Sequence, residues 1–110
     1  MEKLVEGDVI VLEFPFSDLK FYKRRPSLII KIPKGEDVII CQITSESQEK
    51  DVEMPLKNNE FVNGGLRRDS YVRIDKITTI KRTRIKYKIG SLKSEKFKEI
   101  LEKICFFLKN

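Results

Sequence analysis

The amino-acid sequence predicts a mainly β fold: a small, strongly bent β barrel or sheet, capped by one C-terminal helix. Five or six short apolar or alternating segments follow one another between residues 9 and 90. Such segments are typical of strands. A single amphipathic helical pattern comes after them. Strands followed by a helix, without β–α alternation, indicate an α+β domain rather than a parallel α/β fold.

Apolar runs and the turn residues between them locate the strands. A first strand is expected at Val9–Leu12, continued by Phe14 and ended by Pro15, because proline cannot donate to the ladder. Further strands are expected at Pro26–Ile32, Val38–Ile43, Val52–Leu56, Ser70–Asp75 with Ile77–Ile80, and Tyr87–Gly90. Loops or turns are expected at residues 15–25, 33–37, 45–51 and 57–65. The run at Val38–Ile43 is nearly all apolar, which is typical of a central strand.

The helix is predicted from Ser94, a plausible N-cap residue. Its apolar positions are Phe97, Ile100, Leu101, Ile104, Phe107 and Leu108. This spacing places them on one face of a helix. The apolar ending at residues 105–108 is wide for the helix of a monomer, so a partner contact is expected there.

A chain of 110 residues suits one domain, residues 1–110, with one core. No apolar run approaches the ~18 residues of a membrane span, and the N-terminus lacks a signal-peptide pattern. A cytoplasmic protein without membrane contact is therefore expected. Cys41 and Cys105 both lie in apolar surroundings. They are expected to be buried free thiols, with one disulfide as the alternative.

The absence of histidine limits the possible chemistry. With only two cysteines, zinc sites of the Cys/His type are excluded. Ser–His and Cys–His nucleophilic pairs are excluded as well. No metal or cofactor is expected, and acid–base work falls to carboxylates, Lys, Tyr or Arg.

Positive charge is unevenly spread along a chain whose net charge is +6. Basic segments at residues 20–35 and 81–110 flank an acidic segment at residues 36–60. This distribution favours a polyanion-binding face. The densest cluster, Lys23-Arg24-Arg25, comes directly before Pro26 and a buried strand, where a rigid scaffold can aim it at a phosphate. The alternative is an ordinary solvated run of charges.

The loop predicted at residues 15–25 mixes aromatic and basic residues. Phe16, Phe21 and Tyr22 alternate with Lys20 and the basic cluster. Aromatic faces next to cations suit single-stranded nucleic acid, which offers bases for stacking and phosphates for pairing. Alternatively, one or two of these rings pack on the core and hold the loop down.

The segment Ser70–Asp75 alternates cleanly between apolar and polar residues. Val72 and Ile74 fall on one face of the predicted strand, so Arg73 and Asp75 lie side by side on the other. This pair can serve in catalysis or can be an ordinary salt bridge.

Five segments, in this order, resemble the MazF/PemK family of toxin endoribonucleases. They are Gly7-Asp8-Val9-Ile10-Val11, Arg25-Pro26-Ser27-Leu28-Ile29-Ile30, Ile43-Thr44-Ser45, Asp69 to Ile80, and Lys88-Ile89-Gly90-Ser91-Leu92 before the closing helix. The resemblance implies an SH3-like β barrel of five to seven strands with a C-terminal helix, and a homodimer. It also implies sequence-specific, metal-independent cleavage of single-stranded mRNA and a cognate antitoxin, for which the basic face favours an acidic segment.

The resemblance also implies site residues. Arg25 and Thr44 match residues held catalytic in MazF-like members, and Arg73 and Asp75 match a catalytic pair of the Kid/PemK branch. A histidine proposed to assist in that branch has no counterpart in this chain. The residues expected to contact RNA are Phe16, Lys20, Lys23, Arg24 and Ser45.

The residue types fit cleavage by the ribose 2′-OH, which leaves a 2′,3′-cyclic phosphate and a 5′-OH. Arginine forks match phosphate oxygens, and Asp75 can be the base if burial raises its pKa, although Arg73 opposes that rise. For Thr44, a strand-end hydroxyl that bonds the backbone is the alternative. Two other functions remain open: a non-enzymatic, CcdB-like toxin that binds gyrase, and an SH3-like nucleic-acid-binding module.

Overall fold

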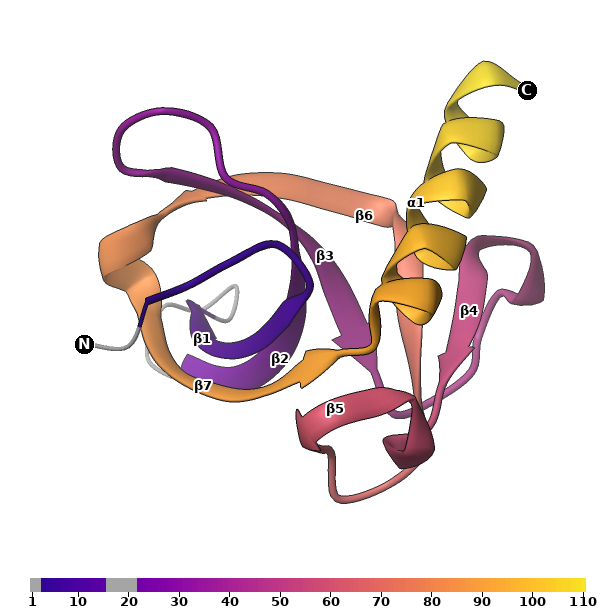
Figure 1. The fold of residues 1–110 in the computed structure, drawn as a ribbon, viewed down its shortest axis with the longest axis horizontal. Coiled ribbons are helices and arrows are strands. Elements are labelled where there is room, and N and C mark those ends of the chain that lie inside the picture. The colour runs from indigo at the N-terminus through magenta and orange to yellow at the C-terminus, as the bar shows by residue number, and fades with distance from the viewer. Residues whose placement is uncertain (1–2, 16–21) are drawn as a thin grey trace.

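The computed structural model describes the backbone of residues 3–15 and 22–110, and the side chains of residues 3–13 and 24–110. Within these residues, seven antiparallel strands form one curled sheet, and a helix packs beside it (Figure 1). The elements are β1 (Asp8–Pro15), β2 (Tyr22–Lys31), β3 (Asp37–Thr44), β4 (Glu53–Leu56), β5 (Phe61–Gly64), β6 (Ser70–Lys81), β7 (Ile85–Leu92) and α1 (Ser94–Lys109). The strand order is β4-β6-β3-β2-β1-β7-β5. The predicted mainly β fold with one C-terminal helix is confirmed, and the sheet curls into a half-barrel.

The structure corrects two predicted boundaries. Strand β2 begins at Tyr22 instead of Pro26, because β1 continues to Pro15 and pairs with residues predicted to be loop. Strand β5 lies inside the segment 57–65, which was predicted to be a turn region. Only the first residue of β5 is buried, so the strand has no apolar pattern and depends on pairing with β7.

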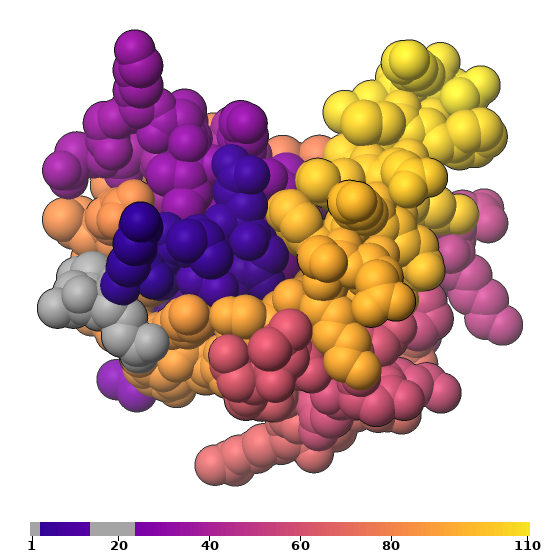
Figure 2. All heavy atoms as spheres, viewed as in Figure 1, coloured from indigo at the N-terminus to yellow at the C-terminus, as the bar shows by residue number. Residues whose placement is uncertain are grey.

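Helix α1 confirms the predicted apolar face. Ile100 and Ile104 are buried against the sheet, and Lys93 rather than Ser94 is the N-cap residue. The last turns project beyond the barrel (Figures 1 and 2), and there Phe106 and Leu108 are 65% and 67% exposed. In the described part of the chain, no helix is long and apolar enough to cross a membrane.

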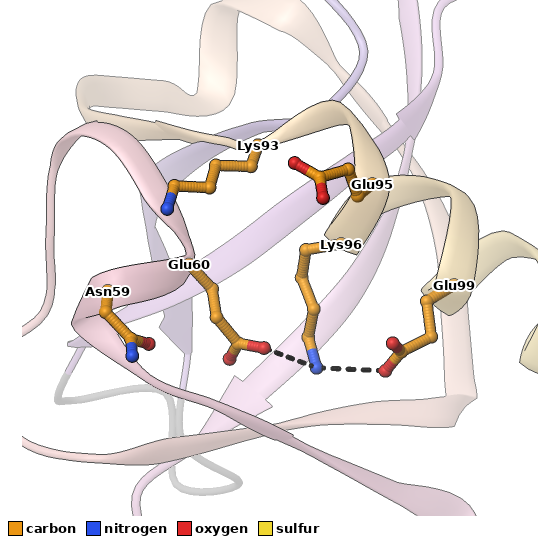
Figure 3. Close-up of a pocket in the computed structure, with 6 residues that line it drawn as sticks. All are labelled: Asn59, Glu60, Lys93, Glu95, Lys96 and Glu99. Carbon is orange, nitrogen blue, oxygen red and sulfur yellow. Dashed lines mark hydrogen bonds and ion pairs between the residues drawn. The ribbon is translucent and has the colours of Figure 1, made fainter.

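A pocket of about 310 Å³ lies where the first turn of α1 meets the short 3-10 helix η2 (Asn58–Glu60) (Figure 3). The ammonium of Lys96, which is nearly buried, lies 3.0 Å from Glu60 Oε2 and 3.2 Å from Glu99 Oε1. Two carboxylates offset the cost of burying this charge. The ion pairs therefore fasten the helix to the segment before β5, and none of the predicted site residues lines the pocket.

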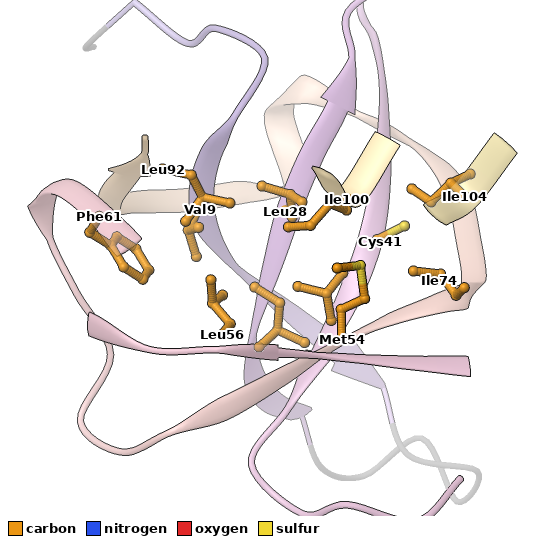
Figure 4. Packing of buried hydrophobic residues seen from close by; sticks show 12 residues of the cluster. Val9, Leu28, Cys41, Met54, Leu56, Phe61, Ile74, Leu92, Ile100 and Ile104 are labelled. Carbon is orange, nitrogen blue, oxygen red and sulfur yellow. The ribbon is translucent and has the colours of Figure 1, made fainter. Parts of the chain in front are cut away.

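Buried apolar side chains cover both faces of the central strands. The first cluster lies between the sheet and α1 (Figure 4) and consists of Val9, Leu28, Cys41, Ile43, Met54, Leu56, Phe61, Val72, Ile74, Leu92, Ile100 and Ile104. The second cluster fills the opposite face and consists of Leu4, Ile10, Leu12, Ile29, Val38, Ile40, Ile80 and Ile85. Strands buried on both faces read as continuous apolar runs. This explains the run at 38–43, whose strand lies inside the sheet between β2 and β6, as predicted.

The two cysteines are both free, but they differ in exposure. Cys41 belongs to the first cluster, and burial raises the pKa of its thiol to about 12. Cys105 is exposed on α1. The expectation of two buried thiols is therefore wrong for Cys105, because the end of the helix projects from the sheet.

Gly7 and Asp8 determine how β1 begins. Gly7 has φ +95°, which a residue with a side chain rarely adopts. Asp8 is fully buried, and its carboxylate accepts hydrogen bonds from Val5 N (2.8 Å) and Ser91 Oγ (2.7 Å). This carboxylate joins the N-terminal turn to β7, so the Gly-Asp sequence has a clear structural role.

Strand β6 bends sharply within its length. Ile43 of β3 pairs with Val72 and Cys41 pairs with Ile77, so residues 73–76 face a single residue of β3. Figure 1 shows the sharp turn of β6; β4 pairs with residues 70–73, and β3 pairs with the strand on both sides of the bend. Extra residues on one strand of a pair bend that strand and increase its twist. The bend therefore presents residues 73–76 at a corner of the sheet.

The buried hydroxyl of Ser27 generates a first prediction. Ser27 is fully buried, and its Oγ has no hydrogen-bond partner among the described residues. An unsatisfied buried hydroxyl costs ~1 kcal/mol or more, so Ser27→Ala is expected to raise the free energy of unfolding by ~1 kcal/mol. Urea denaturation measures this change.

The matched control is Ser91→Ala. It removes a hydroxyl that donates to the buried Asp8 carboxylate, so it is expected to lower the free energy of unfolding by ~1–2 kcal/mol. Equal destabilisation by the two substitutions would contradict the prediction for Ser27.

Candidate nucleic-acid interface

A row of side chains crosses three strands at one end of the sheet. The pairing of β2 with β3 ends at Ser27 and Gln42, and Arg25 and Thr44 each lie two residues beyond that pair. Thr44 pairs in turn with Tyr71 of β6. Residues opposite each other in antiparallel strands point to the same face. Thr44 and Tyr71 are therefore neighbours on one face, and Arg25 lies at the same end of the paired strands.

This row lies where the second cluster ends. On its other side, Arg25 pairs with Leu12 of β1, a buried member of that cluster. The same sheet face thus changes from apolar to polar within one residue pair. Arg25 is half-buried, and no ion pair joins it to an acidic residue in the described part of the chain. Its guanidinium has no competing carboxylate there.

Arg73 and Asp75 occupy the corner of β6. Arg73 Nε lies 2.9 Å from Asp75 Oδ1 and Nη2 lies 2.8 Å from Oδ2, a bidentate pair. The Arg73 side chain is 9% exposed and that of Asp75 is 26% exposed. Hydrogen bonds from Arg73 hold the pKa of Asp75 below its ordinary value, and they outweigh the opposing effect of partial burial. The sequence prediction that these side chains lie side by side is confirmed.

Glu53 of β4 pairs across the sheet with Arg73. Its buried carboxylate accepts hydrogen bonds from Ser47 Oγ (2.7 Å), Gln48 N (2.7 Å) and Glu49 N (3.0 Å). The two backbone amides are the main reason that the pKa of Glu53 lies below its ordinary value. The loop that follows β3 is thereby fastened beside the Arg73–Asp75 pair.

Thr44 and Ser45 end β3 next to this loop. Thr44 Oγ1 accepts a hydrogen bond from Glu46 N (3.2 Å) and lies 3.3 Å from Glu46 O, to which it donates. The Thr44 hydroxyl therefore bonds the backbone in the free chain. This is the structural alternative to the catalytic role that the sequence suggested for it. Ser45 is exposed and follows directly.

The basic cluster begins β2 rather than forming a loop. Arg24 is exposed and pairs across the sheet with Glu13 of β1. The pKa of Glu13 is lowered chiefly by a hydrogen bond from Lys86, with a smaller contribution from the charge of Arg24. Lys23 is placed in β2 by its backbone alone. Phe16 and Lys20, which are predicted to bind RNA, lie outside the described residues, as does Phe21.

Sequence reasoning missed several residues at this end of the sheet. Glu53 gave no signal, because its role depends on cross-strand pairing with Arg73. The exposed Arg67 and Arg68 lie in the loop before β6, which Asn58 holds through its Oδ1 and Nδ2 atoms, 2.8 Å each from Leu66 N and O. Paired arginines next to glycines are a signal that could have identified this loop.

No metal-binding group is evident at the interface. Across residues 3–13 and 24–110, no three His, Cys, Asp or Glu side chains gather closely enough to hold a metal ion.

Comparison with known proteins identifies the family. Residues 6–108 match the model of the PemK-like, MazF-like toxins of type II toxin–antitoxin systems, so the chain belongs to this family. A comparison with curated proteins found no match.

Solved structures share the fold. The Mycobacterium tuberculosis toxin MazF-mt6 is 24% identical, with a TM-score of 0.68, 88% of this chain and 91% of that chain being covered. A mycobacterial endoribonuclease in complex with its cognate antitoxin is 17% identical, with a TM-score of 0.72. The match covers 97% of this chain and 96% of that chain. MazE–MazF from Deinococcus radiodurans is 20% identical, with a TM-score of 0.74 and 98% coverage of both chains.

The Arg73–Asp75 pair predicts a pH-dependent contribution to stability. The pKa of Asp75 is lower in the folded chain than the ~3.9 of an unfolded carboxyl. Its contribution is therefore present above pH ~4 and is lost as pH falls through the folded-state pKa. Asp75→Asn is expected to lower the free energy of unfolding by ~1 kcal/mol at pH 7 and by much less near pH 2.

Urea denaturation at both pH values measures this difference. The control is Asp37→Asn, whose partner Lys81 and own side chain are largely exposed. This exposed pair is expected to contribute ~0.5 kcal/mol or less. An effect of Asp75→Asn that is independent of pH would contradict the prediction.

Proposed function

We propose that this chain is a metal-independent endoribonuclease that cleaves single-stranded mRNA at specific sequences. The observation that carries the proposal is the position of Arg25 and Thr44 just beyond the last pair of β2 and β3, at the end of β3 where Thr44 pairs with Tyr71 and β6 carries the Arg73–Asp75 pair. Membership of a toxin family supports it, as does the endoribonuclease activity named for a mycobacterial protein of the same fold.

The two arginines suit a single scissile phosphate. Arg25 lies near the start of β2 and Arg73 in the bend of β6, and only β3, which ends at Thr44, separates these two strands in the sheet. Guanidinium groups match phosphate oxygens in geometry and remain charged at every working pH.

Asp75 is the proposed base for the ribose 2′-OH. In the free chain, Arg73 keeps this carboxylate ionised, which is the state that accepts a proton, but also makes it a weak base. A phosphate that draws the guanidinium toward itself weakens the hold on Asp75 and lets its pKa rise. The 2′ oxygen then bonds to phosphorus, its proton passes to Asp75, and the P–O5′ bond breaks. The 5′ oxygen takes up a proton and leaves as a 5′-OH.

The remaining predicted residues are proposed to hold the strand on either side. Thr44 can exchange its backbone bond for the scissile phosphate or the 2′-OH, and Ser45 is exposed beside it. Arg24 and Lys23, together with Phe16 and Lys20, are proposed to contact flanking phosphates and bases. Cations paired with aromatic faces suit single strands.

RNA cleavage in EDTA tests this function. Wild type is expected to yield fragments with 5′-OH and 2′,3′-cyclic phosphate ends, located by sequencing the 5′ ends. Arg25→Ala is expected to lower kcat/KM by ~100-fold or more, as for the loss of one charge-stabilising donor. The control Lys34→Ala removes an exposed cation from the turn after β2 and should change kcat/KM less than ~3-fold.

Asp75→Asn in the same assay separates an enzyme from a binding module. A base variant loses turnover and keeps RNA binding, whereas a module without turnover binds RNA more tightly after losing a negative charge. The paired state of Arg73 and Asp75 is the observation that favours a binding module. Intact RNA over varied sequences, together with inhibition of gyrase supercoiling, would instead select the CcdB-like function.

Two protein partners belong to the proposal. A cognate antitoxin with an acidic segment suits the basic face, and a mycobacterial protein of the same fold was solved with its antitoxin. Protection of RNA by the antitoxin measures this contact. A second copy of the chain is proposed to cover the exposed apolar end of α1, since clustered exposed apolar side chains mark interaction sites. The cytoplasm is the proposed place of action.

The proposed contact between two copies of α1 can be tested by substitution. Phe106→Lys with Leu108→Lys is expected to shift the sedimentation equilibrium to monomer, because charge replaces the apolar contact. The control Val62→Lys alters a residue that is equally exposed, on β5, and should leave the dimer intact. A wild-type monomer at tens of micromolar would refute this part.

A further inference from the structure

Glu53 is a buried carboxylate in a site whose proposed chemistry does not use it. It is 6% exposed and lies across the sheet from Arg73. Three donors from residues 47–49 satisfy its oxygens, and these hydrogen bonds keep its pKa low. Its negative charge is therefore permanent over the working pH range, and its position is fixed.

Arg73 thus stands between two carboxylates with different surroundings. Asp75 is bonded to its guanidinium directly and reaches solvent. Glu53 lies under the loop after β3 and acts on Arg73 through its charge. Of the two carboxylates, Asp75 is the more exposed and can meet RNA, so Glu53 is the one that can remain a counter-ion throughout a reaction.

We propose that Glu53 is a positioning residue for RNA cleavage: a fixed counter-ion that holds Arg73 in place while Asp75 exchanges its ion pair for a proton. This inference rests on the proposed function. When Asp75 becomes neutral, Arg73 loses its nearest negative charge. Glu53 then keeps the guanidinium at the corner of β6, facing the phosphate. The three hydrogen bonds to its carboxylate also hold the loop after Thr44 in place.

The groups around Asp75 determine the sign of the effect. Arg73 and Lys76 on β6 and Cys41 on β3 lie near Asp75, whereas Glu53 on β4 and Glu49 in the loop act on Arg73. Removing the charge of Glu53 leaves Arg73 with less competition for Asp75. The carboxyl of Asp75 then becomes more acidic and is a weaker base, while the site as a whole becomes more attractive to phosphate.

Glu53→Gln tests the proposal. It keeps the size of the side chain and an acceptor oxygen but removes the charge. We expect kcat for RNA cleavage to fall ~10-fold, with KM unchanged or lower. In a plot of kcat against pH, the acid limb (the rise on the acid side) should move to lower pH by ~0.5–1 unit. This is the range expected for the loss of one charge several ångströms away. A purely structural anchor would instead raise KM and leave the acid limb in place, and that result would overturn the proposal.

Two further variants separate charge from loop anchoring. Ser47→Ala removes one hydrogen bond to Glu53 and keeps its charge, so the acid limb should not move. Glu49→Gln removes an exposed charge that also acts on Arg73 and leaves the Glu53 bonds intact. It should move the acid limb in the same direction by a smaller amount, which keeps the test decisive if Glu53→Gln fails to fold. No shift in either glutamate variant would refute the counter-ion role.

An NMR titration of the Asp75 carboxyl carbon distinguishes this failure from a failure of the proposed function. In the full chain without RNA, Glu53→Gln is expected to lower the pH at the midpoint of the Asp75 titration. The control Asp37→Asn is expected to leave this midpoint unchanged. If wild type cleaves no RNA, the proposed function fails, whatever this titration shows. If RNA is cleaved and the Asp75 midpoint does not fall, the proposal for Glu53 fails by itself.

Discussion

The bend of β6 is the constraint on which both the barrel and the candidate site depend. Strand β6 pairs with β3 on both sides of the bend, whereas β4 pairs only with residues 70–73, before it. The bend at residues 73–76 therefore turns β6 away from β4 while its pairing with β3 continues. Val72 and Ile74 still point into the first cluster, so the core stays closed around the corner. On the other face of the same segment, Asp75 is partly exposed and the nearly buried Arg73 is held beside it.

Charge at this corner is balanced differently from charge on the rest of the molecule. The chain carries a net charge of +6, which attracts any polyanion over a distance limited by salt. At close range the two arginines of the site differ. Arg73 is held by Asp75 and lies opposite Glu53, whereas Arg25 forms no ion pair with the described acidic residues. An arriving phosphate therefore meets the guanidinium of Arg25, which has no ion pair among the described residues, and that of Arg73, which it must share with Asp75.

The sequence predicted those elements whose signal is local. The apolar run at 38–43, the helical spacing from Phe97 to Leu108 and the alternation at 70–75 each indicated an element that the structure contains. The start of β2 and the whole of β5 were missed, because the start of β2 is basic, β5 buries only its first residue, and both are strands only through their pairing with β1 and β7. The same reason explains why Glu53 was missed.

Alternation by itself determined that Arg73 and Asp75 share a face, because side chains in a strand repeat every two residues. The nearly continuous apolar run at 38–43 likewise indicated a strand inside the sheet. Only the tertiary structure decided which strands lie next to each other, and hence that Thr44 lies opposite Tyr71 and Glu53 opposite Arg73. Register between distant strands is set by the packing of the whole core and by the bend of β6, and no local pattern in the chain encodes it.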